Sequence, residues 1–253
     1  MRSYILEETT WGKLKEQRPD LVVLPWGATE AHNYHLPYGT DNFIAGKLAA
    51  ECVKQAVGKG ANVMVLPSLP FGVNTGQPDI WLDMNLNPGT QFLILKDILT
   101  VLNRQMIRKF VILNTHGGND FKQHIRELNL LFLDMMLTQC NWFKIPGAGQ
   151  FFDDLGEHAG EVETSLMMHL YPELVLPLEN AGTGFAKKFR IAALNQGWAW
   201  AEREWSKVTE DTGIGNPAGA NAEKGEKFFH FLTEKISDFL VEVAEADLDD
   251  LYE

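Results

Sequence analysis

Short apolar runs alternate with longer amphipathic stretches through the first two thirds of this chain. The runs are rich in valine and other large apolar residues, and each is followed by Pro or Asn; they cover residues 21–24, 63–66 and 110–113, with residues 141–145 as a weaker fourth candidate. An apolar run without polar alternation is typical of a strand that is buried on both faces of a parallel sheet. The sequence therefore predicts a mostly parallel sheet.

Amphipathic stretches lie between these runs and predict helices. They cover residues 42–57, 90–107 and 120–137, and a fourth covers residues 223–243. In the third stretch the apolar residues recur at helical spacing, and they are Phe121, Ile125, Leu128, Leu131, Phe132 and Met135. Alternation of strands and helices predicts an α/β fold in which helices cover both faces of an open sheet.

No internal repeat, low-complexity tract or linker interrupts the chain, so residues 1–253 are predicted to form a single domain. Residues 182–222 are rich in Gly, Ala and Trp and have no clear periodicity. No secondary structure is predicted for them.

The composition narrows the range of partners. Hydrophobic residues make up 45% of the chain, as in ordinary globular proteins, and the formal net charge of −12 disfavours nucleic acid. No stretch offers the roughly 20 apolar residues of a membrane span, and the N-terminus lacks an apolar segment typical of export. We therefore expect a cytoplasmic protein with no membrane partner, in which Cys52 and Cys140 are buried thiols.

Polar residues follow the apolar runs, and in a parallel α/β sheet ligands bind beyond the carboxyl ends of the strands. Residues 24–41 carry the densest cluster, with Glu30, His32, His35 and Asp41. In an extended backbone Glu30 and His32 point to the same side. Asp41 opens a predicted helix, whose N-terminus favours an anion. These residues are candidate metal ligands; the alternative is a helix cap beside ordinary loop histidines.

A second polar motif, THGGN, follows the third apolar run and offers His116 as a further ligand, since the glycines after it let the backbone approach closely. Carboxylates and imidazoles without a thiolate suit Zn²⁺, Mn²⁺ or Fe²⁺. A glycine-rich turn that binds no metal is the alternative interpretation.

Four motifs together resemble the creatininase (creatinine amidohydrolase) family. They are EAHNYHLPYGTD, NTHGGN, EHAGEVETS and GIGNPAGANAEKG, in the family's order and within residues 24–227. The resemblance implies a layered αβα domain and a hydrolytic site with one or two divalent ions. The expected ion is zinc, with manganese or iron as alternatives. It also implies a small-molecule amide substrate and a ring-like homo-oligomer such as a hexamer.

The resemblance also assigns roles to individual residues. The metal ligands that it implies are Glu30, His32, Asp41, His116 and Glu163. Asp41 would bridge two ions, His158 would be the catalytic histidine and Glu157 its acidic neighbour. Two alternatives stay open: His158 as a further metal ligand, and Glu163 as a carboxylate that only accepts hydrogen bonds from helix N-terminal amides.

Three departures from the family pattern bear on the substrate. Asn33 stands where most members have glycine, residues 116–119 read HGGN where creatininase has HYEN, and residues 72–87 lack the usual histidine. The missing Tyr and Glu disfavour creatinine. The resemblance to family members that read HGGN implies a small cyclic amide or a formamide, whose C–N bond activated water would cleave. The alternative function is a catalytically silent protein that binds metal or a small ligand on the same scaffold.

Overall fold

A four-stranded, fully parallel sheet forms the centre of the molecule in the computed structural model, which describes residues 2–16 and 18–252. The strands lie in the order β2-β1-β3-β4. Their bounds are Leu21–Trp26 for β1, Val63–Val65 for β2, Lys109–Asn114 for β3 and Met136–Asn141 for β4. The predicted α/β class is confirmed, and the three strongest apolar runs lie in β1, β2 and β3.

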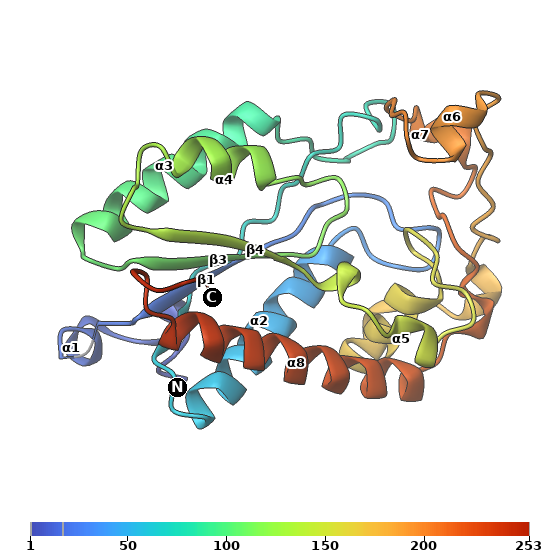
Figure 1. The fold of residues 1–253 in the computed structure, drawn as a ribbon. Coiled ribbons are helices and arrows are strands. Elements are labelled where there is room, and N and C mark those ends of the chain that lie inside the picture. Colours follow the sequence, from blue (N-terminus) through green and yellow to red (C-terminus); the bar gives the residue numbers. More distant parts are fainter. Residues whose placement is uncertain (1, 17, 253) are drawn as a thin grey trace.

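Helices lie on both faces of the sheet, as predicted (Figure 1). The α-helices are α1 (Trp11–Leu14), α2 (Thr40–Gly58), α3 (Pro88–Arg104), α4 (Lys122–Leu128), α5 (Glu161–Leu170), α6 (Ala192–Asn195), α7 (Trp205–Val208) and α8 (Ala222–Glu245). Helices α3 and α4 cover one face, while α2 and α8 cover the other together with α5. Within the described ranges, none of these helices combines the length and apolarity needed to cross a membrane.

Strand β1 shows how the sheet joins two hydrophobic cores. Leu21 and Val23 pack with α2 and α8, whereas Val22, Leu24 and Trp26 pack with α3 on the opposite face, because successive side chains of a strand point to opposite sides. All five are essentially inaccessible to solvent. Burial of one such side chain contributes roughly 1.5–3 kcal/mol, so β1 fixes the sheet through both of its faces.

Two predicted elements after residue 120 are wrong in their bounds. The predicted helix 120–137 ends at Leu128, and the chain then turns and forms β4, so the fourth strand lies at Met136–Asn141 and not at residues 141–145. Strand β4 is an edge strand that pairs with β3 only. Most of its residues are half-buried, so it needs no continuous apolar run and its sequence does not resemble the inner strands.

Residues 182–213 form an arm that projects beside the carboxyl ends of the strands and carries the short helices α6 and α7 (Figure 1). The base of the arm is fastened by Asp211, whose carboxylate accepts the backbone N–H groups of Gly184 at 2.8 Å and Gly213 at 2.9 Å. The Asn33 side chain accepts the N–H of Gly182 at 2.7 Å and donates to its carbonyl at 3.2 Å. The arm is thereby tied to the loop that follows β1.

Candidate metal centre

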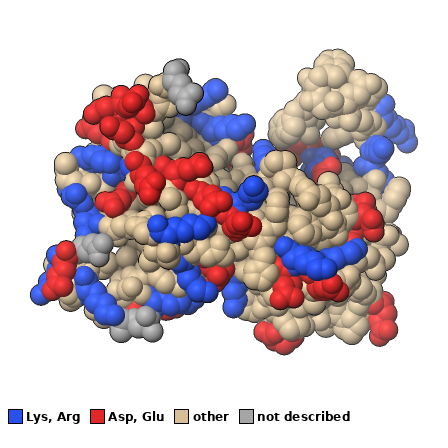
Figure 2. Space-filling model, turned by 60° about the horizontal axis from the view of Figure 1, so that its bottom comes forward, with Lys and Arg blue, Asp and Glu red and all other residues tan. Residues whose placement is uncertain are grey.

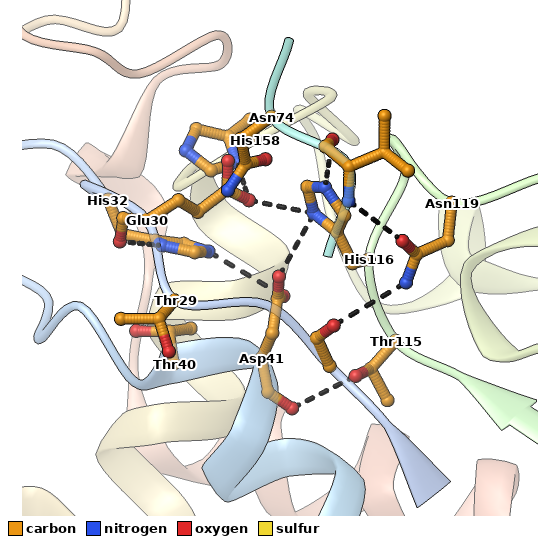
Figure 3. Close-up of polar contacts among 12 residues, drawn as sticks. Thr29, Glu30, His32, Thr40, Asp41, Asn74, Thr115, His116, Asn119 and His158 are labelled. Atoms are coloured by element: carbon orange, nitrogen blue, oxygen red, sulfur yellow. Dashed lines mark hydrogen bonds and ion pairs between the residues drawn. The ribbon is translucent and has the colours of Figure 1, made fainter. Parts of the chain in front are cut away.

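The candidate site lies at the switch point of the sheet, between β1 and β3. The chain leaves β1 toward β2 on one side and leaves β3 toward β4 on the other, and ligands of open α/β sheets bind in the crevice that such diverging connections leave. Glu30 and His32 follow β1, and His116 follows β3. Asp41 lies in the first turn of α2. The structure brings these four predicted ligands together (Figure 3).

Two buried carboxylates form the centre of the cluster. His116 Nδ1 lies 2.8 Å from Glu30 Oε1 and 3.1 Å from Asp41 Oδ2. The other oxygen of Glu30 accepts a hydrogen bond from Gln77 Nε2 at 2.7 Å. Asp41 stands at a helix N-terminus, where the helix dipole favours a negative charge. Both carboxylates are therefore turned toward the ring of His116.

Three histidines each contact a backbone carbonyl oxygen through one ring nitrogen. His32 Nδ1 lies 3.1 Å from the carbonyl oxygen of Glu30, and His158 Nε2 lies 2.8 Å from that of Ala31. His116 Nε2 lies 3.0 Å from the carbonyl oxygen of Val73. A carbonyl oxygen only accepts hydrogen bonds, so each of these nitrogens carries a proton, whether the ring is neutral or charged.

The opposite nitrogen of each histidine faces a carboxylate. His32 Nε2 lies 3.6 Å from Asp41 Oδ1, and His158 Nδ1 lies 3.7 Å from Glu30 Oε1. In a neutral ring this nitrogen carries a lone pair, and a lone pair that faces a carboxylate oxygen is repelled unless a cation lies between them. Such anchoring through the second ring nitrogen is typical of metal-binding histidines.

Unpaired buried atoms give a direct test of whether a metal fits. Glu30 Oε1, His32 Nε2 and Asp41 Oδ2 are buried without a partner in hydrogen-bond geometry. His116 Nδ1 lies close to oxygens of both carboxylates, but a single N–H on it could satisfy only one of them. Unsatisfied buried polar atoms are costly, and a divalent cation would satisfy all three. The residues present fit a metal ion.

The donor atoms fall into groups of three that could each hold one ion, with the atoms of a group within 4.8 Å of one another. One group is Glu30, Asp41 and His116, and a second is His32, Asp41 and Glu163. These two share Asp41, the residue predicted to bridge two ions. A third group joins Glu30 and His32 with His158. The positions of these atoms are therefore also compatible with the alternative in which His158 is a metal ligand.

The charges of the cluster shift its titration when no ion is bound. Burial acts to lower the pKa of His32, but the hydrogen bond and charge of Asp41 outweigh it and raise the pKa to about 10. Burial likewise opposes the charged form of His116, and the charge of Glu30 raises its pKa well above the usual value. Burial raises the pKa of Glu163. An incoming cation must therefore displace protons from these rings, which makes its affinity depend on pH.

Glu163 and Gly118 are linked by the local geometry. Glu163 lies in the first turn of α5 and accepts the N–H of Ala159 at 2.6 Å, while belonging to the group of donors around Asp41. A Cβ on Gly118 would collide with the carbonyl oxygen of Val73, which anchors His116. A side chain at residue 118 is thus incompatible with this anchor. Glu163 is the carboxylate that joins His32 and Asp41 in the second group of donors.

His158 and its neighbour Glu157 point in different directions. The ring of His158 lies inside the cluster, 4.2 Å between centroids from the ring of His32. The carboxylate of Glu157 forms an ion pair with Arg203 at 2.8 Å, and its side chain is 61% exposed. The structure therefore brings His158 to the other predicted site residues, but not Glu157.

Three residues at the site were not singled out from the sequence: Gln77, Arg203 and Trp205. Gln77 supports Glu30, and Trp205 lies edge-on to His158 at 5.6 Å between ring centroids. The Arg203 guanidinium lies over the Trp205 ring at 4.9 Å. All three come from segments without a regular hydrophobic period, and the richness in Trp of residues 182–222 was the only sequence signal for any of them.

A cavity of about 880 Å³ contains this cluster and is lined by Glu30, Asp41, His116, His158 and Glu163 together with parts of the arm.

A parallel α/β sheet with buried carboxylates and imidazoles at its switch point defines the class: an α/β protein with a candidate divalent-metal centre. The family model described as creatinine amidohydrolase matches residues 7–240. The chain belongs to the creatininase family of amidohydrolases.

Individual relatives support this assignment. The chain is 29% identical to the creatinine amidohydrolase of Pseudomonas putida over 69% of this chain and 74% of that protein. It is 26% identical to the mycofactocin precursor peptide peptidase of Mycolicibacterium smegmatis over 83% of this chain and 79% of that protein.

Solved structures agree with the fold. A crystal structure from Bacteroides fragilis, provisionally named a creatinine amidohydrolase, is 42% identical, covers 100% of both chains and has a TM-score of 0.92. A creatininase variant of Zn-Zn type is 22% identical with a TM-score of 0.78 over 97% of this chain and 100% of that one. A manganese creatininase is 21% identical with a TM-score of 0.78 over 96% and 99%.

Proposed function

We propose that the protein is a metal-dependent hydrolase that cleaves a non-peptide C–N bond in a small cyclic amide or formamide-type group. The observation that carries this proposal is the anchoring of three imidazoles by backbone carbonyls, with their free nitrogens facing the buried carboxylates. Ring nitrogens and carboxylate oxygens that converge without partners do not stabilise a fold, so their convergence indicates a functional site.

The residues that would hold the metal follow from the donor groups. Glu30, Asp41 and His116 would hold one ion, and His32 and Glu163 would hold a second together with Asp41. Zinc is the proposed metal, with manganese or iron as alternatives, because the donors are oxygen and nitrogen; relatives in zinc and manganese forms support this choice. Such an ion, when bound, polarises a carbonyl and lowers the pKa of water.

His158 is the proposed proton donor to the leaving nitrogen. Its Nε2 is held by the Ala31 carbonyl, so Nδ1 is the ring atom turned toward the reacting groups. The departing nitrogen of an amide is a poor leaving group until it is protonated, and Nδ1 can accept a proton from the attacking water and then donate it to that nitrogen. Ala31 supplies the orienting contact, whereas a catalytic role for Glu157 stays a prediction.

The substrate proposal depends on the shape of the HGGN loop. Gly117 and Gly118 line the cavity beside His116, and neither supplies the aromatic wall or the carboxylate of creatininase. Creatinine is therefore not proposed as the substrate. The peptidase activity named for the mycobacterial relative shows that larger amides occur among the chain's relatives, so the assay must include amides of different sizes.

Metal analysis followed by a substrate screen tests the proposal. The protein is purified without added metal, its metal content is measured, and it is then stripped with a chelator and reloaded with Zn²⁺ or Mn²⁺. We expect the protein to hydrolyse at least one formamide, lactam or cyclic urea. This activity should be lost when the metal is stripped and regained when it is reloaded. Stoichiometric metal without hydrolysis of any amide in the screen would support the silent binding protein instead.

We also propose that the chain acts in the cytoplasm as a single domain that assembles into a homo-oligomer. Large exposed apolar side chains on the arm, including Phe185, Trp198 and Trp200, support the assembly, since such residues are enriched at interfaces. Light scattering of the purified protein would test it, with a monomer mass of 28.5 kDa as the contradicting result.

A further inference from the structure

A second cavity, of about 1000 Å³, lies beside the cavity of the metal centre. The arm forms one of its walls, and the segments around Asp154 and Ile214 form another. The residues that line both cavities are Gly156, Glu157, Trp200, Ala201 and Arg203. Because the two cavities share these residues, they adjoin each other at this point, as a ligand that extends from the metal centre into the second cavity would require.

The part of the arm that lines both cavities is held in place by the loop that follows β2. The backbone N–H of Trp205 donates to the carbonyl of Gly76 at 2.9 Å, and the Thr75 hydroxyl donates to the Glu202 carboxylate. These contacts fix residues 202–205 from the side of the metal centre, while Asp211 and Asn33 fasten the base of the arm. The junction is thus a preformed feature of the fold.

Positive charge faces the second cavity. Lys187 and Lys188 line it, and Arg203 lies at the junction. Among the residues that the structure describes, neither lysine has an ion-pair partner within 4.0 Å, whereas Lys207 on the same arm is paired with Glu204. In Figure 2 the surface is hollowed beneath the lobe at the upper right, and blue side chains lie at the edge of that lobe.

The carboxylates that line this cavity are already engaged. Asp154 accepts two backbone N–H groups, at 2.9 and 3.0 Å. Glu157 is paired with Arg203, but both side chains are partly exposed, at 61% and 33%. An exposed ion pair contributes little to stability, so a carboxylate of a ligand can replace Glu157 on the guanidinium, whose planar fork suits such a partner.

Arg203 connects this charge to the reacting groups. Its guanidinium lies over the Trp205 ring at 4.9 Å, and that ring is perpendicular to the ring of His158, with 5.6 Å between the centroids. A carboxylate bound by Arg203 would therefore lie one aromatic side chain away from His158. The lysines extend the positive surface farther from the metal centre.

We propose that the second cavity binds the remote, anionic part of the substrate, so that the reacting formamide-type group is carried on an elongated molecule bearing a carboxylate, such as a short acidic peptide with an N-terminal formyl group. This inference rests on the proposed hydrolase function and specifies its substrate class. The net charge of −12 does not oppose it, because charges beyond about 8 Å are largely screened at physiological ionic strength.

The test compares three formamides on the zinc-loaded full chain. They are N-formyl-Gly-Gly-Asp, its uncharged counterpart N-formyl-Gly-Gly-Asn amide, and the short N-formylglycine amide. We expect kcat/KM to be about tenfold higher for the acidic peptide than for the uncharged one, and the ratio to fall as salt is raised. The double variant Lys187→Ala/Lys188→Ala should remove most of this ratio.

Arg190→Ala is the matched control, because Arg190 is exposed on the same arm but does not line the cavity. It should retain the ratio of the wild type. Equal kcat/KM values for the acidic and uncharged peptides, or equal ratios in the double variant and in Arg190→Ala, would overturn the subsite and leave the hydrolase function standing.

A binding measurement separates the subsite from catalysis. Calorimetric titration of the zinc-loaded protein with N-acetyl-Gly-Gly-Asp should show binding that weakens about tenfold in the lysine double variant. If no formamide is hydrolysed while this binding and its dependence on the lysines persist, the proposed function is wrong and the subsite is supported. Absence of binding to the wild type would overturn the subsite.

Discussion

Loss of Glu30 or Asp41 should affect the metal centre strongly, since each belongs to two of the donor groups, as His32 does, and each also brings a carboxylate charge. We expect Glu30→Gln and Asp41→Asn to lose most bound metal, because an amide keeps the shape of the side chain and removes its charge. The fold should persist, since the cluster lies at the edge of the sheet. Elemental analysis and circular dichroism measure the two effects. Metal content equal to that of the wild type in both variants would refute the assignment.

A single variant of His158 distinguishes a role as general acid from a role as metal ligand. We expect His158→Ala to retain its metal and to lose turnover by roughly 10²–10⁴-fold, the usual contribution of a general acid. The reason is that Nδ1 is free to transfer a proton while Nε2 is held by Ala31. Metal content and kcat of the same preparation are the measurements. Parallel loss of metal would make His158 a ligand, and unchanged turnover would exclude it from the mechanism.

His35 gives the fold a dependence on pH. Its Nε2 contacts the Thr164 hydroxyl at 2.9 Å, and burial, reinforced by the charge of His32, lowers its pKa to about 4. In the unfolded chain the pKa is about 6.5, so between these values the unfolded state binds more protons. This contribution makes the free energy of unfolding fall as the pH falls through that window.

The variant His35→Asn tests this contribution because its side chain does not titrate. Denaturant unfolding of the metal-free wild type and variant at pH 4–7 should show a shallower decrease for the variant toward acid. The comparison cancels the titration of groups common to both proteins. Equal slopes would show that His35 does not carry the effect.

At the scale of elements, Gly225 in α8 is required by the packing of α8 against α5. A Cβ there would collide with the carbonyl oxygen of Ser165. We expect Gly225→Ala to lower the free energy of unfolding by about 1–3 kcal/mol, the usual range for overpacking, even though alanine is the better helix former. Denaturant unfolding monitored by circular dichroism is the measurement.

Gly46 in α2 provides the control for Gly225, because a Cβ added there meets nothing within 4 Å. Gly46→Ala should stabilise the protein by about 0.5–1 kcal/mol through helix propensity alone. If both variants shift stability in the same direction, the close approach of α8 to α5 is not what Gly225 provides.

The elements that could be predicted from the sequence are those whose environment is uniform. Strand β1 is buried on both faces and therefore consists of apolar residues, whereas β4 is half-buried at an edge, where Thr138 and Gln139 are accepted and no run appears. The conformation of the arm could not be predicted, because it depends on hydrogen bonds made by Asn33 and Asp211. No hydrophobic periodicity within the arm indicates these contacts.

The candidate site divides in a similar way. Glu30, His32 and Asp41 could be predicted because one short segment carries them and turns them toward one point. Gln77 and Arg203 could not, since Gln77 reaches Glu30 across 47 residues and Arg203 approaches through an irregular arm. Contacts of this kind depend on how separate loops fold back, which the spacing along the chain does not specify.

For the whole molecule, metal binding should raise stability. Buried carboxylates and unsatisfied donors converge at the centre, and a ligand that binds only the folded state stabilises it by mass action. We expect the Tm of the stripped protein to rise with Zn²⁺ concentration, by the equivalent of about 2.7 kcal/mol at 100 times Kd. Calorimetry at several zinc concentrations measures it, and a Tm independent of zinc would argue against a folded-state site.

The anchoring of the histidines has a consequence for how this chemistry is inherited. Glu30, Ala31 and Val73 hold the three rings through main-chain carbonyl oxygens, an atom that every amino acid possesses. The anchoring contacts therefore do not depend on which side chains stand at residues 31 and 73, and the tautomers of the rings can be preserved when those residues change. Evolution can therefore conserve the protonation pattern of this centre without conserving the amino acids whose carbonyl groups impose it.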